Sequence, residues 1–166
     1  MTTGRTLPKW MKVQVEDSGG VMRDIPVNTA SPVGFTFEEI DVSALQEANK
    51  SFLAGQGSVS VTITGPLDNT AAQAASGTGA APALSGSHIV LSAIATPTYC
   101  NTGRTVAFYQ GIQGYWATGD PVFGGVDSFI ITEYTVDLSN GTYSAKFAYK
   151  SGATAPAWGT AALAAS

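Results

Sequence analysis

The residues that most often carry catalysis are scarce in this chain. His88 is the only histidine and Cys100 the only cysteine among 166 residues. A serine or cysteine nucleophile needs a neighbouring base, and the sequence contains no Gly-x-Ser-x-Gly elbow. Zinc sites need several Cys or His ligands, and the acidic residues are too dispersed for a calcium loop. The sequence therefore predicts no enzyme, no bound metal and no cofactor.

The remaining polar and aromatic candidates have simpler structural explanations. Glu38 and Glu39 are adjacent, so in a strand they point to opposite faces and cannot act together as a glycosidase pair. Trp10, Trp116 and Trp158 could form a sugar-binding platform. Their wide separation in sequence favours anchoring in a core or an interface instead.

Composition points to a subunit of an assembly. Charged residues make up 12% of the chain, about half the usual share, whereas apolar residues make up a normal 44%. Interface cores are depleted in charge, so a weakly charged surface is expected of a protein that associates. The formal net charge is −4 and the eight basic residues are scattered, which argues against tight nucleic-acid binding. No apolar run is long enough for a membrane anchor, and no signal peptide is expected.

Alternation of apolar and polar residues predicts a chain made mainly of strands. A turn at 17–20 and the Asn140-Gly141 pair are typical of hairpins. The strands are expected at 11–16, 21–25, 33–40, 58–64, 88–94, 105–109, 129–134 and 143–149.

One helix is predicted at about 43–54. Asp41 precedes it, Ser43 can cap it with Gln46 three residues later, and Gly55 can end it. The expected fold is therefore mainly β: an antiparallel β-sandwich or barrel over residues 11–150, with this one α-helix packed against it.

Three segments of low complexity flank or interrupt that domain. Residues 1–10 and 151–166 are predicted to be flexible arms, and 69–87 a long mobile loop.

The order of the elements between Lys12 and Asp68 resembles the tail tube proteins of long-tailed, siphovirus-like bacteriophages. The resemblance rests on a series of short segments rather than on one motif. They are Val13–Asp17 with Gly20, Arg23–Ile25, Ile40–Ser43, Lys50–Gly55 and Ser58–Asp68.

This resemblance implies a virion structural protein assembled in the host cytoplasm. Six copies would form a ring, and rings would stack into a tube that conducts the genome. The implied partners are further copies of the chain, tail terminator and distal tail proteins, and transiently the tape-measure protein and genomic DNA. If part of the negative charge faces inward, DNA would be repelled from the wall.

Contacts between subunits or rings are expected from aromatic residues and from the long loop. A head-decoration or other β-sandwich binding module, a neck or terminator protein and the tube of a contractile injection system remain alternatives. The candidate contact residues are Trp10, Phe35, Phe37, Asn69, Thr70, Trp116 and Trp158.

Overall fold

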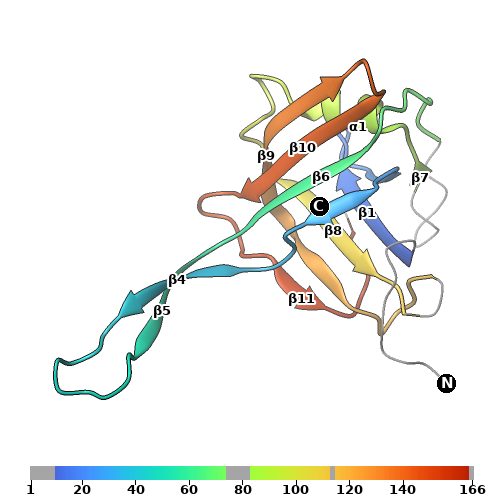
Figure 1. Ribbon diagram of the computed structural model, residues 1–166. Coiled ribbons are helices and arrows are strands. Elements are labelled where there is room, and N and C mark those ends of the chain that lie inside the picture. The colour runs from blue at the N-terminus through green and yellow to red at the C-terminus, as the bar shows by residue number, and fades with distance from the viewer. Residues whose placement is uncertain (1–9, 74–82, 113–114, 165–166) are drawn as a thin grey trace.

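The computed structural model describes residues 10–73, 83–112 and 115–164 (Figure 1). This part of the chain contains eleven strands and one short helix. In chain order they are β1 (Met11–Glu16), β2 (Met22–Ile25), β3 (Thr29–Ser31), β4 (Thr36–Asp41), β5 (Phe52–Ser58), β6 (Ser60–Pro66), β7 (Ala83–Leu84), α1 (Ser87–Ile94), β8 (Arg104–Gln110), β9 (Val122–Asp137), β10 (Thr142–Tyr149) and β11 (Ala157–Gly159).

Nine strands belong to one sheet that curls around the core, and β4 pairs only with β5. The large sheet runs in the order β3-β6-β10-β9-β8-β1-β2-β7, and β11 pairs with β9. All pairs are antiparallel except β2 with β7. The prediction of a mainly β, sandwich-like antiparallel fold with one helix is confirmed.

The long strand β9 joins the two halves of the curled sheet. Its second half pairs with β10, and its first half pairs with β8 and β11. Between these halves the register with β8 shifts, and Asp127 adopts a φ of 52°. A Cβ at Gly124 would lie 2.3 Å from the Val106 carbonyl oxygen, so only glycine allows the two strands to approach this closely.

The core is filled from both halves of the sheet. Alternate side chains of β1, β6, β8, β9 and β10 point inward, and α1 packs on the same cluster with three of its apolar residues. The largest of these fully buried side chains are Phe108, Phe123, Phe129, Phe147, Ile63, Leu91 and Ile94.

Helix α1 lies where the sequence predicts a strand, at 88–94. Val90, Leu91 and Ile94 are all buried on one side of the helix, a spacing that fits a helix as well as a short strand. Gly86 precedes it in a site too tight for any Cβ, which would lie 2.5 Å from the Asp68 carbonyl oxygen. The Ser87 hydroxyl donates to the Pro66 carbonyl oxygen at 2.9 Å and ties the start of the helix to β6.

The predicted helix at 43–54 is wrong: β4 and β5 form a hairpin, and residues 42–51 connect them. The Ser43 hydroxyl accepts a hydrogen bond from the Ser51 amide at 2.7 Å, and Asp41 accepts one from the Ser43 amide at 2.9 Å. These bonds close the end of a hairpin rather than cap a helix. Gly55 lies within β5 and ends no helix.

The predicted long loop and C-terminal arm are more ordered than expected. In the predicted loop, β7 (Ala83–Leu84) pairs with β2 and α1 begins at Ser87, so the loop ends before residue 87. Residues 74–82 of this loop lie outside the described part. In the predicted arm, β11 pairs with β9 and Leu163 packs against a second small apolar cluster. The predicted N-terminal arm, apart from Trp10, also lies outside the described residues.

An ion pair in the first turn makes stability depend on pH. Burial raises the pKa of Asp17, but the Arg23 guanidinium at 2.8 Å and the amides of Val21 and Gly19 outweigh it and lower that pKa below its usual 3.8. A carboxyl group whose pKa is lower in the folded state stabilises the fold at pH values above its ordinary pKa. That stabilisation is lost as the pH falls through the pKa of the folded state. We expect the urea midpoint to fall between about pH 5 and about pH 3, and Arg23→Gln to flatten part of that fall. Parallel curves for the two proteins would contradict this role.

Candidate assembly interface

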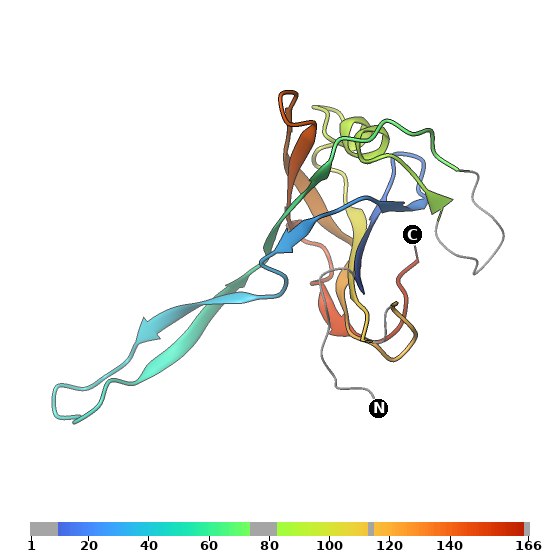
Figure 2. The same cartoon turned by 45° about the vertical axis from the view of Figure 1, so that its right-hand side comes forward.

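The β4–β5 hairpin projects from the body of the subunit. Figures 1 and 2 show it leaving the curled sheet and extending away from it in both views. Every residue of β4 is exposed, and in β5 only Gly55 is half-buried. Strands of this length span about 20 Å, and an isolated two-stranded hairpin is only marginally stable in water.

This hairpin carries an unusual density of exposed large apolar side chains. Phe37 lies over Gly57, where a Cβ would be 2.9 Å from the ring, and Ile40 reaches toward Gly55 and stands opposite Leu53. Glycine on β5 thus makes room for the apolar side chains of β4. The exposed fractions are Phe37 55%, Ile40 45%, Val42 47%, Leu45 106%, Phe52 51% and Leu53 59%.

The net charge of the hairpin is close to that of the whole chain. Four carboxylates, at Glu38, Glu39, Asp41 and Glu47, stand against the single cation of Lys50, which leaves −3 out of the total of −4. Hydrogen bonds from the Ser43 side chain and amide lower the pKa of Asp41, so this carboxylate stays charged at neutral pH. The hairpin is therefore an apolar surface with an acidic fringe.

An aromatic stack fixes the root of the hairpin on the body. Phe37 stacks on Phe35 with ring centroids 5.9 Å apart, and Phe35 meets the buried Phe123 edge-on at the same distance. Trp158 of β11 lies beside Phe123 at 5.0 Å. Gly34, with a φ of 122°, lets the chain turn against the Trp158 ring. The stack connects the core to the projecting strand and sets its direction.

The remaining predicted contact residues lie elsewhere and do not gather into one site. Trp116 packs edge-on against Tyr109 and donates its indole N–H to the Asp120 carbonyl oxygen at 3.1 Å. Trp10 is half-buried just before β1, and Asn69 and Thr70 are exposed after β6. Because Trp116 and Trp158 pack on different partners, the tryptophans make no shared sugar-binding platform. Of the predicted contact residues, Phe35, Phe37 and Trp158 lie at the root of the hairpin, whereas the sequence predicts a helix in place of β5 and the connection before it.

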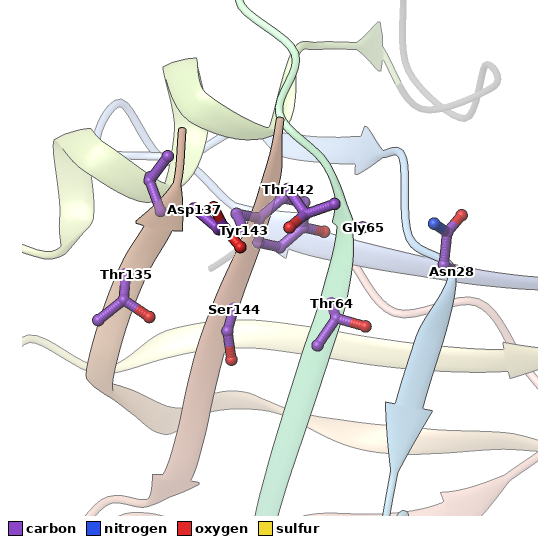
Figure 3. Close-up of a pocket in the computed structure, with 9 residues that line it drawn as sticks. Asn28, Thr64, Gly65, Thr135, Asp137, Thr142, Tyr143 and Ser144 are labelled. Atoms are coloured by element: carbon purple, nitrogen blue, oxygen red, sulfur yellow. The ribbon is translucent and has the colours of Figure 1, made fainter. Parts of the chain in front are cut away.

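The surface offers little that suggests chemistry. The described residues contain no group of three His, Cys, Asp or Glu side chains that could hold a metal ion. A shallow depression of about 330 Å³ is lined mainly by hydroxyl and backbone groups of β6, β9 and β10, as Figure 3 shows. His88, the single histidine, binds the Tyr134 hydroxyl through Nδ1 at 2.7 Å and links α1 to β9. Within the described ranges, no helix is long and apolar enough to cross a membrane.

Comparisons with known proteins find this fold in chains of contractile injection systems. No family model and no curated protein matches the chain. A chain in the anti-feeding prophage baseplate structure matches with a TM-score of 0.58 and 11% identity, over 98% of this chain and 100% of that one. A chain of the sheath–tube complex of the PVC extracellular contractile injection system, in the extended state, matches with a TM-score of 0.52 and 11% identity, over 95% and 93%.

A chain in the structure of the anti-feeding prophage tube-terminating cap matches with a TM-score of 0.54 and 12% identity, over 95% of this chain and 92% of that one. At identities this low the likeness establishes a shared fold alone. The chain has, over nearly its whole length, the fold of proteins found in contractile injection particles.

Proposed function

We propose that this protein is a structural subunit of the tube in a phage-tail-like particle, and that it assembles through the β4–β5 hairpin. The observation that carries the proposal is the hairpin itself: six large apolar side chains are exposed on an arm that no other described residue covers. The shared fold with chains of injection particles supports it.

The energetics of the hairpin favour a protein partner. Burying a fully exposed Leu or Phe side chain contributes about 1.5–3 kcal/mol, so six half-exposed side chains supply several kcal/mol when covered. A marginal two-stranded sheet gains further stability when another surface supports it. A second copy of the chain is the partner that a tube provides at every position, and repetition of one contact between copies builds a ring or a helix.

The number of copies, their stacking and the end partners are proposed by analogy with the tail tube proteins that the sequence resembles. Six copies close a ring, rings stack, and the tube ends on terminator and distal tail proteins in a virion or virion-like particle. The cargo of a phage tube is DNA, preceded by the tape-measure protein. The curled sheet of the subunit supplies edge strands, such as β3, whose outer backbone groups a neighbouring copy can pair.

The experiment is to concentrate the purified protein and follow its association. We expect sedimentation velocity to show a small species at low concentration that gives way to large particles as concentration rises. Negative-stain images of those particles are expected to show hollow rings or tubes of uniform width. Particles that remain single at every concentration would exclude the proposal.

A second candidate is a terminating ring of the same kind of particle. The likeness to a chain in the anti-feeding prophage cap structure, with a TM-score of 0.54, specifically favours it. A terminator closes one end, so its rings would not stack on one another. Discrete rings that never lengthen with concentration would support the terminator over the tube.

Removing the aromatic support of the hairpin is expected to weaken assembly. Aromatic pairs are worth about 0.5–1.5 kcal/mol beyond the area they bury, so Trp158→Ala should raise the concentration needed for assembly up to about tenfold. The Trp158 ring is half exposed, so the fold should remain. The measurement is the concentration at which pelletable particles appear. Tyr115→Ala removes an exposed aromatic outside the root and is the control; equal effects of the two variants would show that the stack plays no special part.

A further inference from the structure

Strand β11 leaves a backbone edge open beside the base of the hairpin. It pairs with β9 through Ala157–Gly159, and no described strand pairs with its other side. All three of its residues are exposed. In Figures 1 and 2 the chain from β10 to β11 passes beside the point where the hairpin leaves the body. An open edge of this kind can receive a strand from another chain.

The hairpin has open edges as well, because β4 and β5 pair only with each other in the described part of the chain. A two-stranded sheet is only marginally stable in water, and a third strand stabilises it. Pairing of a hairpin strand with β11 of another copy would therefore satisfy backbone groups on both partners.

Exposed apolar side chains lie around β11. Trp158 is 50% exposed, and Phe35, which is 39% exposed, packs on the same Phe123 ring. Val126 is 44% exposed and follows the β9 residues that pair with β11. Tyr149 is 39% exposed at the end of β10. These side chains offer the hairpin an apolar surface to cover.

Lys150 supplies a cation to the same region. It directly follows β10, in the segment that leads to β11, and makes no ion pair with the described residues. The other basic residues that the structure describes outside the hairpin are already engaged or buried. They are Lys12 over the Tyr109 and Trp116 rings, Arg23 paired with Asp17, the buried Arg104, and Lys146 opposite Glu133 in the strand register. We call β11 with Phe35, Val126, Tyr149 and Lys150 the acceptor surface.

We propose that the β4–β5 hairpin of one copy docks on the acceptor surface of the next copy, along the open edge of β11 and with its carboxylates facing Lys150. The inference rests on the proposed function and deepens it, because it names the surface that receives the hairpin. Charge complementarity selects this occupant: the hairpin carries a formal −3, and Lys150 is a cation without a partner in the described chain. The hairpin and its acceptor are different surfaces, so the contact runs head to tail and can repeat without limit.

Cross-linking with a short bismaleimide tests the placement. Ala54→Cys on β5 and Gly159→Cys on β11 are made separately in a Cys100→Ser background, because Cys100 is the one native thiol. Ala54 is exposed, and a Cβ at Gly159 would meet no described atom within 4 Å, so both positions accept the change. Equal amounts of the two variants are mixed, assembled and treated, and linked pairs are read on a denaturing gel.

We expect linked pairs in assembled mixtures and none in dilute subunits. Leu138→Cys, in the turn between β9 and β10, replaces Gly159→Cys as the matched control and should lose the linked pairs. Equal linking to residues 138 and 159, no linking to residue 159, or linking of Ala54→Cys copies among themselves would overturn the inference.

Charge reversal tests the part of Lys150. Lys150→Glu should raise the concentration needed for assembly about threefold to tenfold, and adding Glu38→Lys and Glu39→Lys should restore most of it. Lys146→Glu makes the same change elsewhere on β10 and is the control. An equal effect of Lys146→Glu, or no restoration, would overturn the inference while assembly itself remains. If the unchanged protein does not associate, the proposed function fails first.

Discussion

Leu53→Asp is expected to abolish assembly while the body of the subunit stays folded. Leu53 is 59% exposed on β5, so the change places no charge in the core of the subunit. In an assembled particle, however, the same carboxylate would be buried against a neighbouring copy without a partner, which is strongly unfavourable. A loss of about 2 kcal/mol or more at each contact weakens that contact at least about thirtyfold. Leu45→Asp at the end of the hairpin should act in the same direction.

A matched control exists on the same chain. Leu138 is 84% exposed in the turn between β9 and β10, away from the hairpin, so Leu138→Asp makes the same chemical change outside the proposed contact. We expect Leu138→Asp to assemble like the original protein in sedimentation, and all three variants to keep the original circular dichroism spectrum. Assembly of Leu53→Asp at the original concentration would show that the hairpin is not the contact.

Phe129→Ala is expected to cost about 3–5 kcal/mol of folding stability, a large part of the 5–15 kcal/mol that a domain of this kind has. Phe129 is fully buried just after the bend of β9, and its ring meets that of Phe108 at a centroid distance of 6.2 Å. Its removal leaves a cavity where the two halves of the sheet meet, and the tightly paired strands on both sides can relax only in part.

Urea unfolding of the dilute subunit measures this effect. Val126→Ala, three residues earlier on the same strand but 44% exposed, is the control and should cost less than about 1 kcal/mol. Similar midpoints for the two variants would mean that Phe129 does not support the core in the way described.

The strands of the body could be predicted because their side chains alternate between core and water. In β6, Val61 and Ile63 point inward while Thr62 and Thr64 point outward, and the sequence shows this pattern directly. The Asn140-Gly141 pair predicts the hairpin turn equally well. In the structure Gly141 takes the left-handed φ of 63° that such a turn requires.

The hairpin could not be predicted in the same way because neither of its faces is buried in the subunit. The strand predicted at 33–40 overlaps β4, but no alternation marks β5, and Leu45, Ala48 and Phe52 recur at helical spacing. In α1 the opposite occurred: the β-branched residues Ile89 and Val90 favoured a strand, and tertiary packing of Val90, Leu91 and Ile94 on the core made a helix. Where local pattern and long-range contacts disagree, the contacts decide.

Among the residues of the proposed contact, the sequence singles out only aromatic ones. Phe35, Phe37 and Trp158 stood out by type, and the structure brings them together at the hairpin root. Ile40, Leu45 and Leu53 looked like ordinary core or helix residues, because exposure in the folded chain is a property of the three-dimensional structure.

The most direct measurement is a cryo-electron microscopy reconstruction of the protein at a concentration where it associates. We expect hollow particles in which residues 36–58 lie against a neighbouring copy, with Phe37, Leu45 and Leu53 removed from water. Particles whose copies touch through other surfaces, with the hairpin still free in solvent, would contradict it.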